Sequence, residues 1–503
     1  MNYSGHGSPG SISHEQVLKL ADFKDATSNR LPLWLTASCD IMPFDGQEEN
    51  IGEEALFNPK GGAVAFYGTT RTVYSTQNEL MNAEFMKRVL NIGGGDNTIG
   101  EAVRLAKNSL VNSSTDLSAN KLQYSLLGDP ALRLVYPKLK VVVDSIGGMK
   151  ADEANVVQLK AGMQVEVKGH IERDGTAVTD YDGVVSAMVR DAMEKVVCRL
   201  NNQSDDGAET AFQFNDRSKT LFKGSDSIRN GRFAFSFAVP KDITYSEGSG
   251  LLNLYAVDNS KRNVANGHHD GFVLNGSLET LRDSIGPSVY CYLNSSSFTN
   301  GDEVNATPYF VAEINDENGI NSTGNGIGHD LELIIDGEMS KTYVLNDFFE
   351  FDFGSFKSGR LGYSIPQLEP GVHKLLFRAW DILNNSTTSE LTFTVAKSVK
   401  PRLFDVDCTK NPATTSTTFR IMHDRAGSEI DVVLDIFDMS GRHLWSNATK
   451  GVSANNILNI DWDLTVNGGR RLGTGVYLYR VRISCDGSSY ASKAKKLIII
   501  SNK

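Results

Sequence analysis

Apolar and polar residues follow two different patterns along this chain of 503 residues, and the pattern changes near residue 137. Before that point, nearly continuous apolar runs of strand length, LPLWLTASC (31–39) and GGAVAFYG (61–68), alternate with segments of helical spacing. Continuous apolar runs are typical of strands that are covered on both faces. The pattern therefore predicts an α/β domain over residues 1–137.

The helical segments of this first part have apolar residues three and four positions apart. Helices are predicted over residues 12–23, 78–90 and 98–111. The third begins with Thr98 and Glu101, at the spacing of a capping box. The run GDPALRLVYP (128–137) is predicted to be the last short strand of the domain.

From residue 138 onward the apolar residues alternate with polar ones, which predicts an all-β structure. Runs such as QVEVKGHIE (164–172) read as strands, and the pairs Asp174-Gly175 and Asn230-Gly231 are typical of tight hairpin turns. The segment 180–200 fits either a helix or two strands, and we favour strands. The adjacent His268 and His269 should point to opposite faces of a strand, which argues against a shared metal ion.

Breaks in this pattern near GSLETLRDSIGPSV and KSVKPRL predict three further domains. They are a β-rich domain over 138–285, an immunoglobulin-like β domain over 286–397, and a C-terminal immunoglobulin-like β-sandwich over 398–503. Within the second of these, NDENGINSTGNGIGHD (315–330) lacks the full spacing of a calcium loop and is predicted to be a long surface loop.

Composition narrows the function. The formal net charge is −11, and no cluster of Lys and Arg is present, so a general nucleic-acid binder is excluded. No run approaches the ~18 apolar residues of a membrane helix. The first residues have neither the basic region nor the apolar core of a secretory signal. The five cysteines are far apart and show no metal-ligand spacing.

One pair of residues could carry chemistry. His6 lies between two glycines, and Cys39 ends an apolar strand, where side chains emerge at the carboxyl edge of a sheet. A cysteine nucleophile needs a base and donors for the oxyanion, and an imidazole is the natural base near neutral pH. The alternative is a buried, inert thiol and an unrelated histidine.

Four motifs in order carry a family resemblance: NYSGHGS (2–8), WLTASCDIMPFDGQEENIGE (34–53), GGAVAFYGTTR (61–71) and LLGDPALRL (126–134). Together they resemble the gingipain-type cysteine peptidases, which are bacterial relatives of the caspases. The resemblance covers roughly the first 130 residues. It implies that this part is a partial caspase- or gingipain-like α/β domain.

The resemblance also implies roles for particular residues. His6 would be the general base, Cys39 the nucleophile, and the backbone amides of Gly7 and Cys39 the oxyanion hole, with no catalytic metal ion. The acidic residues after Cys39 would flank the cleft, where they would favour a basic substrate, hold a structural calcium ion, or form a plain solvated loop. These residues are Asp40, Asp45, Glu48, Glu49 and Glu53.

The chain departs from the family at its start. Such peptidases carry a further acidic residue and much of their central sheet before the histidine, whereas here five residues precede His6. We therefore expect this chain to be the C-terminal portion of a longer protein, with a signal peptide upstream of Met1. We also expect weak turnover from these 503 residues alone.

The last ~100 residues add a second resemblance. FDMSGRHLW (437–445) and WDLTVNGGRRLGTGVYLYRV (462–481) are similar to the immunoglobulin-like C-terminal domains of the type IX secretion pathway. With the peptidase motifs, they make the chain resemble the type IX sortases. This implies an outer-membrane enzyme on the extracellular face that cleaves the C-terminal signal domains of secreted cargo proteins. It would transfer the cargo to an amine of anionic lipopolysaccharide, or to water, alongside outer-membrane components of the pathway.

A different hypothesis is a non-catalytic cell-surface β-module protein with a vestigial peptidase remnant. The two hypotheses differ in the reactivity that they predict for Cys39. In an active site Cys39 should react quickly with thiol-directed electrophiles near pH 6, whereas in an inactive remnant it should not.

Overall fold

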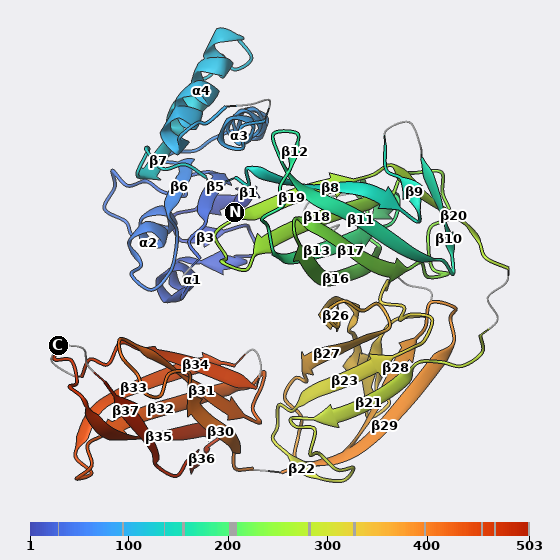
Figure 1. Ribbon diagram of the computed structural model, residues 1–503. Helices are drawn as coiled ribbons and strands as arrows, with labels where there is room; N and C mark the ends of the chain where they lie inside the picture. The colour runs from blue at the N-terminus through green and yellow to red at the C-terminus, as the bar shows by residue number, and fades with distance from the viewer. Residues whose placement is uncertain are drawn as a thin grey trace. The chain divides into compact units, whose positions relative to one another are not determined.

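The computed structural model describes the chain except residues 29, 93–94, 135, 153–155, 201–208, 280–282, 325–327, 397–398, 454–455, 467–468 and 501–503. The chain divides into two compact units, Met1–Tyr136 and Pro137–Lys503, each of which is described by itself (Figure 1). Among the described helices, none is both long and apolar enough to cross a membrane.

The first unit is built on a four-stranded sheet in the order β1-β5-β6-β7. The strands are β1 (Asn2–Ser4), β5 (Leu33–Ala37), β6 (Ala65–Thr69) and β7 (Tyr124–Gly128). The first three are parallel and β7 is antiparallel to β6. The carboxyl ends of three neighbouring strands therefore meet at one edge of the sheet, where ligands bind in open α/β sheets.

Helices cover both faces of this sheet (Figure 1). They are α1 (Leu20–Asp25), α2 (Ile51–Phe57), α3 (Ser75–Val89) and α4 (Ile99–Asn112). Trp34 and Phe66 pack in the core that includes α1 and α2, whereas the next residues, Leu35 and Tyr67, pack in the core of α3 and α4. Because both faces of the sheet are buried, its strands cannot alternate apolar with polar residues. They are continuous apolar runs instead, as predicted.

Two of the three predicted helices are confirmed, as α3 and α4. Thr98 caps α4, because its Oγ1 accepts a hydrogen bond from the Glu101 amide at 3.1 Å. The helix predicted over 12–23 is wrong, since the helix begins only at Leu20. Ser13 and Gln16 have φ values of +68° and +55°, which no helix accommodates.

The residues before α1 instead form a small sheet. Its strands are β2 (Gly7–Ser8), β3 (Ser11–Ile12) and β4 (Leu18–Lys19). The last strand of the unit was also misplaced: it is Tyr124–Gly128, after the 3₁₀ turn η1 (Asn120–Gln123), and not 128–137. The hydrogen bonds of β7 to β6 end at Gly128, and a turn follows, in which the Leu132 amide bonds to the Asp129 carbonyl at 3.2 Å.

The second unit begins with a sheet that closes on itself. Its nine strands are β8 (Leu139–Ile146), β9 (Met149–Lys150), β11 (Gln164–Arg173), β12 (Thr176–Ala177), β13 (Gly183–Arg190), β16 (Thr220–Arg229), β17 (Arg232–Ala238), β18 (Leu251–Asp258) and β19 (Val264–His269). Because β11 pairs with both β17 and β8, the sequence β8-β11-β17-β16-β13-β18-β19 returns to β8 and forms a ring of seven strands. Two small pairs join β10 (Val157–Ala161) to β20 (Phe272–Ser277), and β14 (Glu194–Val197) to β15 (Gln213–Asp216).

Tight turns connect neighbouring strands of the nine-stranded sheet as predicted. Asp174 and Gly175 have φ values of +48° and +80°, and Asn230 and Gly231 have +50° and +72°. Two successive positive φ values are what a type I′ hairpin turn requires. The strands favoured for the segment 180–200 are confirmed as β13 and β14.

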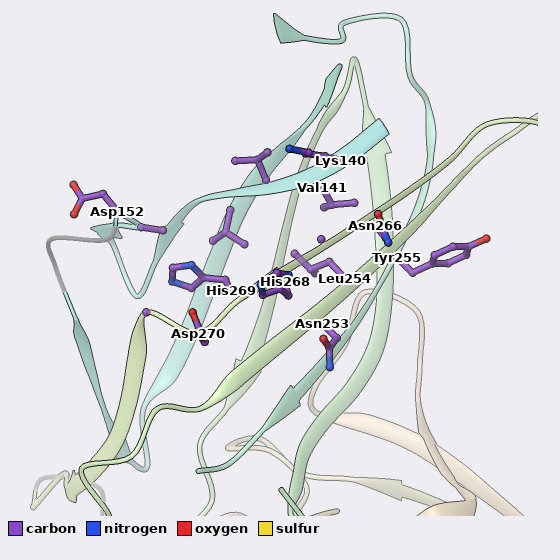
Figure 2. A pocket seen from close by; sticks show the side chains of 15 residues that line it. Lys140, Val141, Asp152, Asn253, Leu254, Tyr255, Asn266, His268, His269 and Asp270 are labelled. Carbon is purple, nitrogen blue, oxygen red and sulfur yellow. The ribbon is translucent and has the colours of Figure 1, made fainter. Parts of the chain in front are cut away.

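The ring has a narrow seam between β8 and β19. The two strands pair at only two positions, Ala265 with Leu139 and Asn266 with Lys140. A pocket of about 800 Å³ lies along this seam, as Figure 2 shows. Beside it, His268 is exposed and His269 is half-buried, with its ring stacked on Phe272 at 6.3 Å. The two histidines thus alternate, as expected in a strand.

Residues 288–395 form two sheets around one core. The first contains β21 (Ser288–Leu293), β23 (Tyr309–Asn315), β27 (Ser358–Ser364) and β26 (Phe349–Phe351). The second contains β22 (Glu303–Val304), β29 (Ser386–Val395), β28 (Gly371–Trp380), β24 (Glu332–Ile335) and β25 (Thr342–Val344). Short 3₁₀ turns, η2 (Met339–Lys341) and η3 (Asn346–Phe348), lie between strands. Phe310 of the first sheet and Phe377 of the second meet in the core, with ring centroids 5.2 Å apart.

Residues 403–499 also form two sheets. One contains β30 (Leu403–Cys408), β31 (Thr417–His423) and β34 (Ile457–Trp462). The other contains β33 (His443–Val452), β32 (Glu429–Phe437), β35 (Gly475–Cys485), β36 (Ser488–Ala491) and β37 (Lys495–Ile499). Phe419 and Tyr479, one from each sheet, are in edge contact at 5.0 Å. The boundary predicted between residues 397 and 398 falls outside the described residues.

The segment 315–330 differs from the surface loop predicted for it. Asp316 and Asn321 are 7% and 1% exposed. Carboxylate oxygens of Asp283, Asp316 and Asp381 lie within 4.8 Å of one another. Burial, and then the neighbouring carboxylates, raise the pKa of Asp316 and of Asp381. In its described residues, the loop is therefore anchored in the protein, because the side chains of Asp316 and Asn321 are buried.

A buried histidine makes the C-terminal part sensitive to acid. His423 is 0% exposed, and burial, with the charge of Arg425, lowers its pKa to about 4. A histidine in the unfolded chain titrates at ~6.5, so between these two pKa values the unfolded chain binds more protons than the folded chain. The stability of the fold therefore decreases as the pH is lowered through that window. We expect a loss of about 3 kcal/mol between pH 7 and pH 4. Urea unfolding of His423→Gln should lose this pH dependence, whereas His443→Gln, at an exposed position, should keep it.

Candidate active site

The pairing of β1 with β5 sets the positions of His6 and Cys39. Ser4 pairs with Ala37 in a parallel register. His6 lies two residues after Ser4, and Cys39 lies two residues after Ala37. Neighbouring strands are ~4.8 Å apart. The register therefore gives the two predicted residues equivalent positions, each two residues beyond the last paired residue, at the carboxyl edge of the sheet.

Close packing keeps the two loops together beyond the strands. The Gly5 amide donates to the Ala37 carbonyl at 3.3 Å. A Cβ atom on Gly7 would lie 2.7 Å from Ser38 Oγ and 2.9 Å from Ser38 Cβ. Glycine is needed at position 7, because any side chain would push the histidine loop away from the residue before Cys39.

The backbone at His6 is fixed from two sides, while its side chain is exposed. Its carbonyl accepts hydrogen bonds from the Tyr3 hydroxyl at 2.7 Å and from the Ser13 amide at 2.9 Å. The imidazole is thus carried by a fixed backbone and is open to a substrate. This arrangement suits a general base.

The half-buried thiol of Cys39 contacts the backbone of Val73, in the loop after β6. Sγ donates to the Val73 carbonyl at 3.3 Å and accepts from the Val73 amide at 3.5 Å. Within the described part of the chain, the Cys39 amide donates to no backbone carbonyl. Gly7, whose amide is the other predicted oxyanion donor, lies in β2 and pairs with Ile12 of β3. The oxyanion roles of both amides stay predictions.

Asp40 is held in an uncommon conformation next to the thiol. Its φ is +46°, in the left-handed region. Its amide donates to the Arg71 carbonyl at 3.3 Å, and its carboxylate accepts from the Thr72 hydroxyl at 3.0 Å. These contacts tie the loop after Cys39 to the loop after β6.

The other predicted cleft carboxylates are largely engaged within the protein. Asp45 forms a two-bond ion pair with Arg71, at 2.6 and 2.9 Å, and this arginine lowers the pKa of the Asp45 carboxyl. Glu49 pairs with Lys24 at 2.5 Å. Glu53 lies in the first turn of α2 and accepts a hydrogen bond from the Asn50 side chain. The role expected of them toward a substrate or calcium stays a prediction.

A buried polar network behind Cys39 was not predicted. The Tyr74 amide donates to Asn120 Oδ1 at 2.8 Å, and Asn120 Nδ2 donates to Asn78 Oδ1 at 3.1 Å. The Tyr124 hydroxyl donates to the same Asn78 oxygen at 2.8 Å. One sequence signal was present, since Asn78 lies on the apolar face of α3 with Met81 and Phe85, at helical spacing.

The remaining cysteines lie in ordinary positions. All five are free. Cys291 and Cys485 are buried, and burial raises the pKa of each thiol to about 12. Burial also raises the pKa of Cys408. They therefore provide internal standards of low reactivity for Cys39.

Comparisons with known proteins agree with the resemblance of the motifs. The model of peptidase family C25 matches residues 1–135. A crystal structure of dimeric latent PorU from Porphyromonas gingivalis is 34% identical, over 88% of this chain and 41% of that one, with a TM-score of 0.38. A structure described as a protease is 14% identical over 54% of this chain and 53% of its own, with a TM-score of 0.26. No curated protein matches.

The chain thus spans 41% of the length of the PorU chain that it matches. The family match covers the sheet, its helices, and the loops that carry His6 and Cys39. Through its first 135 residues, the chain is therefore similar to peptidase family C25.

Proposed function

We propose that this chain carries a cysteine peptidase site that forms an acyl-enzyme on Cys39, with His6 as the base. The parallel register of β1 and β5, which gives His6 and Cys39 equivalent positions at the sheet edge, is the observation that carries the proposal. The exposed imidazole and the half-buried thiol support it. So does the fixed position of each loop.

In the proposed reaction, the thiol proton passes from Cys39 Sγ to the His6 imidazole, and Sγ forms a bond to the carbonyl carbon of the scissile peptide. The backbone amides of Gly7 and Cys39 stabilise the oxyanion. His6 then gives its proton to the leaving amine as the C–N bond breaks, which leaves a thioester on Cys39. Attack by a second nucleophile releases the acyl group and returns a proton to the sulfur.

We further propose that an amine, as well as water, can act as this second nucleophile, so that the enzyme is a sortase of the type IX kind. The similarity to PorU over 88% of this chain supports the proposal. The substrates would be secreted cargo proteins with C-terminal signal domains, and the acceptor anionic lipopolysaccharide. The enzyme would then act at the outer face of the outer membrane, with other components of the pathway.

The β-rich remainder fits that setting. We propose that 286–397 and 398–503 are immunoglobulin-like domains, each with two sheets around one core, and that 138–285 is a separate β domain. The distinct hydrophobic cores of these three regions support such a division. In this proposal they hold the peptidase site at the cell surface.

Mass spectrometry of peptide cleavage with and without an added amine tests the proposal. The full chain is incubated with a C-terminal signal domain joined to a cargo peptide, in buffer and in glycinamide. We expect the upstream fragment as a free acid in buffer and as its glycinamide adduct with the amine, and neither with Cys39→Ala. If only the free acid forms in the presence of glycinamide, the enzyme is a hydrolase and the proposed sortase activity is refuted. Cleavage by Cys39→Ala would refute the site.

A further inference from the structure

One peptide plane joins Cys39 to the buried network behind it. The Val73 carbonyl, which accepts the Cys39 thiol at 3.3 Å, and the Tyr74 amide, which donates to Asn120 at 2.8 Å, belong to the same peptide group. In a trans peptide the C=O and N–H bonds point in opposite directions. Asn120 therefore fixes the direction in which the Val73 carbonyl points.

Asn120 is itself held from behind. Its side-chain amide donates to Asn78 Oδ1, which also accepts from the Tyr124 hydroxyl. Asn78 and Asn120 are each 5% exposed, and Tyr124 is 0% exposed. Burial, and then the nearby Cys39, raise the pKa of Tyr124, so its hydroxyl remains a donor at every working pH. The three side chains are thus buried and joined by hydrogen bonds, which favours a single geometry for the network.

The segments that carry Val73 and His6 follow the strands on the two opposite sides of β5. β5, which precedes Cys39, lies between β1 and β6 in the sheet. His6 follows β1, and Val73 follows β6. The thiol has one proton, and in this structure it is directed to the Val73 carbonyl. A proton held there is not available to His6.

We propose that Asn120 is a positioning residue that aims the Val73 carbonyl at the Cys39 thiol, so that this carbonyl competes with His6 for the thiol proton. Asn78 and Tyr124 keep Asn120 in place for this purpose. The inference rests on the proposed role of Cys39 as nucleophile. It adds a resting state to the site, in which the carbonyl competes with the base for the same proton.

The pH profile of Cys39 alkylation by iodoacetamide, followed by peptide mapping of the full chain, tests the inference without a substrate. Asn120→Ala should increase the alkylation rate at pH 6 by roughly two- to ten-fold, the effect of losing one ordinary hydrogen bond to the neutral thiol. At pH 9.5 the rates should agree within about two-fold, because a thiolate has no proton to donate to the Val73 carbonyl. Tyr124→Phe, which removes only a hydroxyl, should shift the profile in the same direction by less.

Tyr67→Phe is the matched control. Tyr67 is also 0% exposed, its ring lies 5.5 Å from that of Tyr124, and its hydroxyl contacts Met81 Sδ instead of the network. Its profile should equal that of the parent chain. The inference is overturned if Asn120→Ala and Tyr124→Phe match Tyr67→Phe, if they slow alkylation at pH 6, or if the change is equal at both pH values. Failure of the His6 role would appear separately, in His6→Ala.

Discussion

Replacing His6 by alanine is expected to slow the alkylation of Cys39 at pH 6 by about 10- to 100-fold. In the proposed pair, an imidazolium within a few ångströms of the sulfur would favour the thiolate by about one to two powers of ten, as an opposite charge does. The thiolate is the species that reacts with the electrophile. Because the β1–β5 register gives His6 and Cys39 equivalent positions at the sheet edge, the effect should be large and confined to that cysteine.

His14→Ala is the matched control, since His14 is exposed and lies in the same unit. Its alkylation rate should equal that of the parent chain. Cys291 and Cys485 serve as internal standards in every variant, because their buried thiols should react slowly throughout. Equal rates for His6→Ala and His14→Ala would contradict the assignment of the base and favour a β-module protein with an inactive remnant.

A large structural effect is expected from Gly267→Ala in the seam of the ring. A Cβ atom there would lie 1.9 Å from the Val141 carbonyl oxygen. That oxygen is backbone of β8, whose other edge pairs with β11 over most of its length, so it has little freedom to move. We expect a cost of about 3 kcal/mol or more, at the upper end of overpacking penalties. Amide hydrogen exchange in β8 and β19 should quicken by roughly 100-fold.

Gly473→Ala provides a contrast, because a Cβ there meets nothing within 4 Å. Its exchange pattern should match that of the parent chain. In Gly267→Ala, peptides from the first unit and from β35 should likewise be unchanged, which confines the effect to the ring. Parent-like exchange in β8 and β19 would show that the ring is not closed at this seam.

Local pattern predicted elements well where a single rule decided them. The apolar spacing gave α3 and α4, and the Asp-Gly and Asn-Gly pairs gave hairpin turns with two positive φ values. The helix expected over 12–23 does not form as predicted, because Ser13 and Gln16 have a left-handed backbone in the β2–β3–β4 hairpins. That conformation depends on pairings outside the segment and leaves no trace in its periodicity.

The candidate site, too, could be predicted only in part from the sequence. The residue types around His6 and Cys39 were enough to name the pair as a candidate, since few side chains can act as base and nucleophile. The partners of Asp45 and Glu49 were not predictable, because Arg71 and Lys24 lie more than 20 residues away in the chain. The same holds for the contact of Cys39 with Val73, which uses backbone atoms that any residue would supply.

The sequence by itself determined the α/β character of the first 135 residues, the all-β character of the rest, and the resemblance to a peptidase family, because periodicity and short motifs are local. Tertiary structure alone decided that His6 and Cys39 have equivalent positions at the sheet edge, that the thiol is directed to Val73, and that seven strands close into a ring. Each of these depends on strand register and on backbone hydrogen bonds between distant segments. Such bonds carry almost no side-chain signature, so they become readable only when the chain is folded.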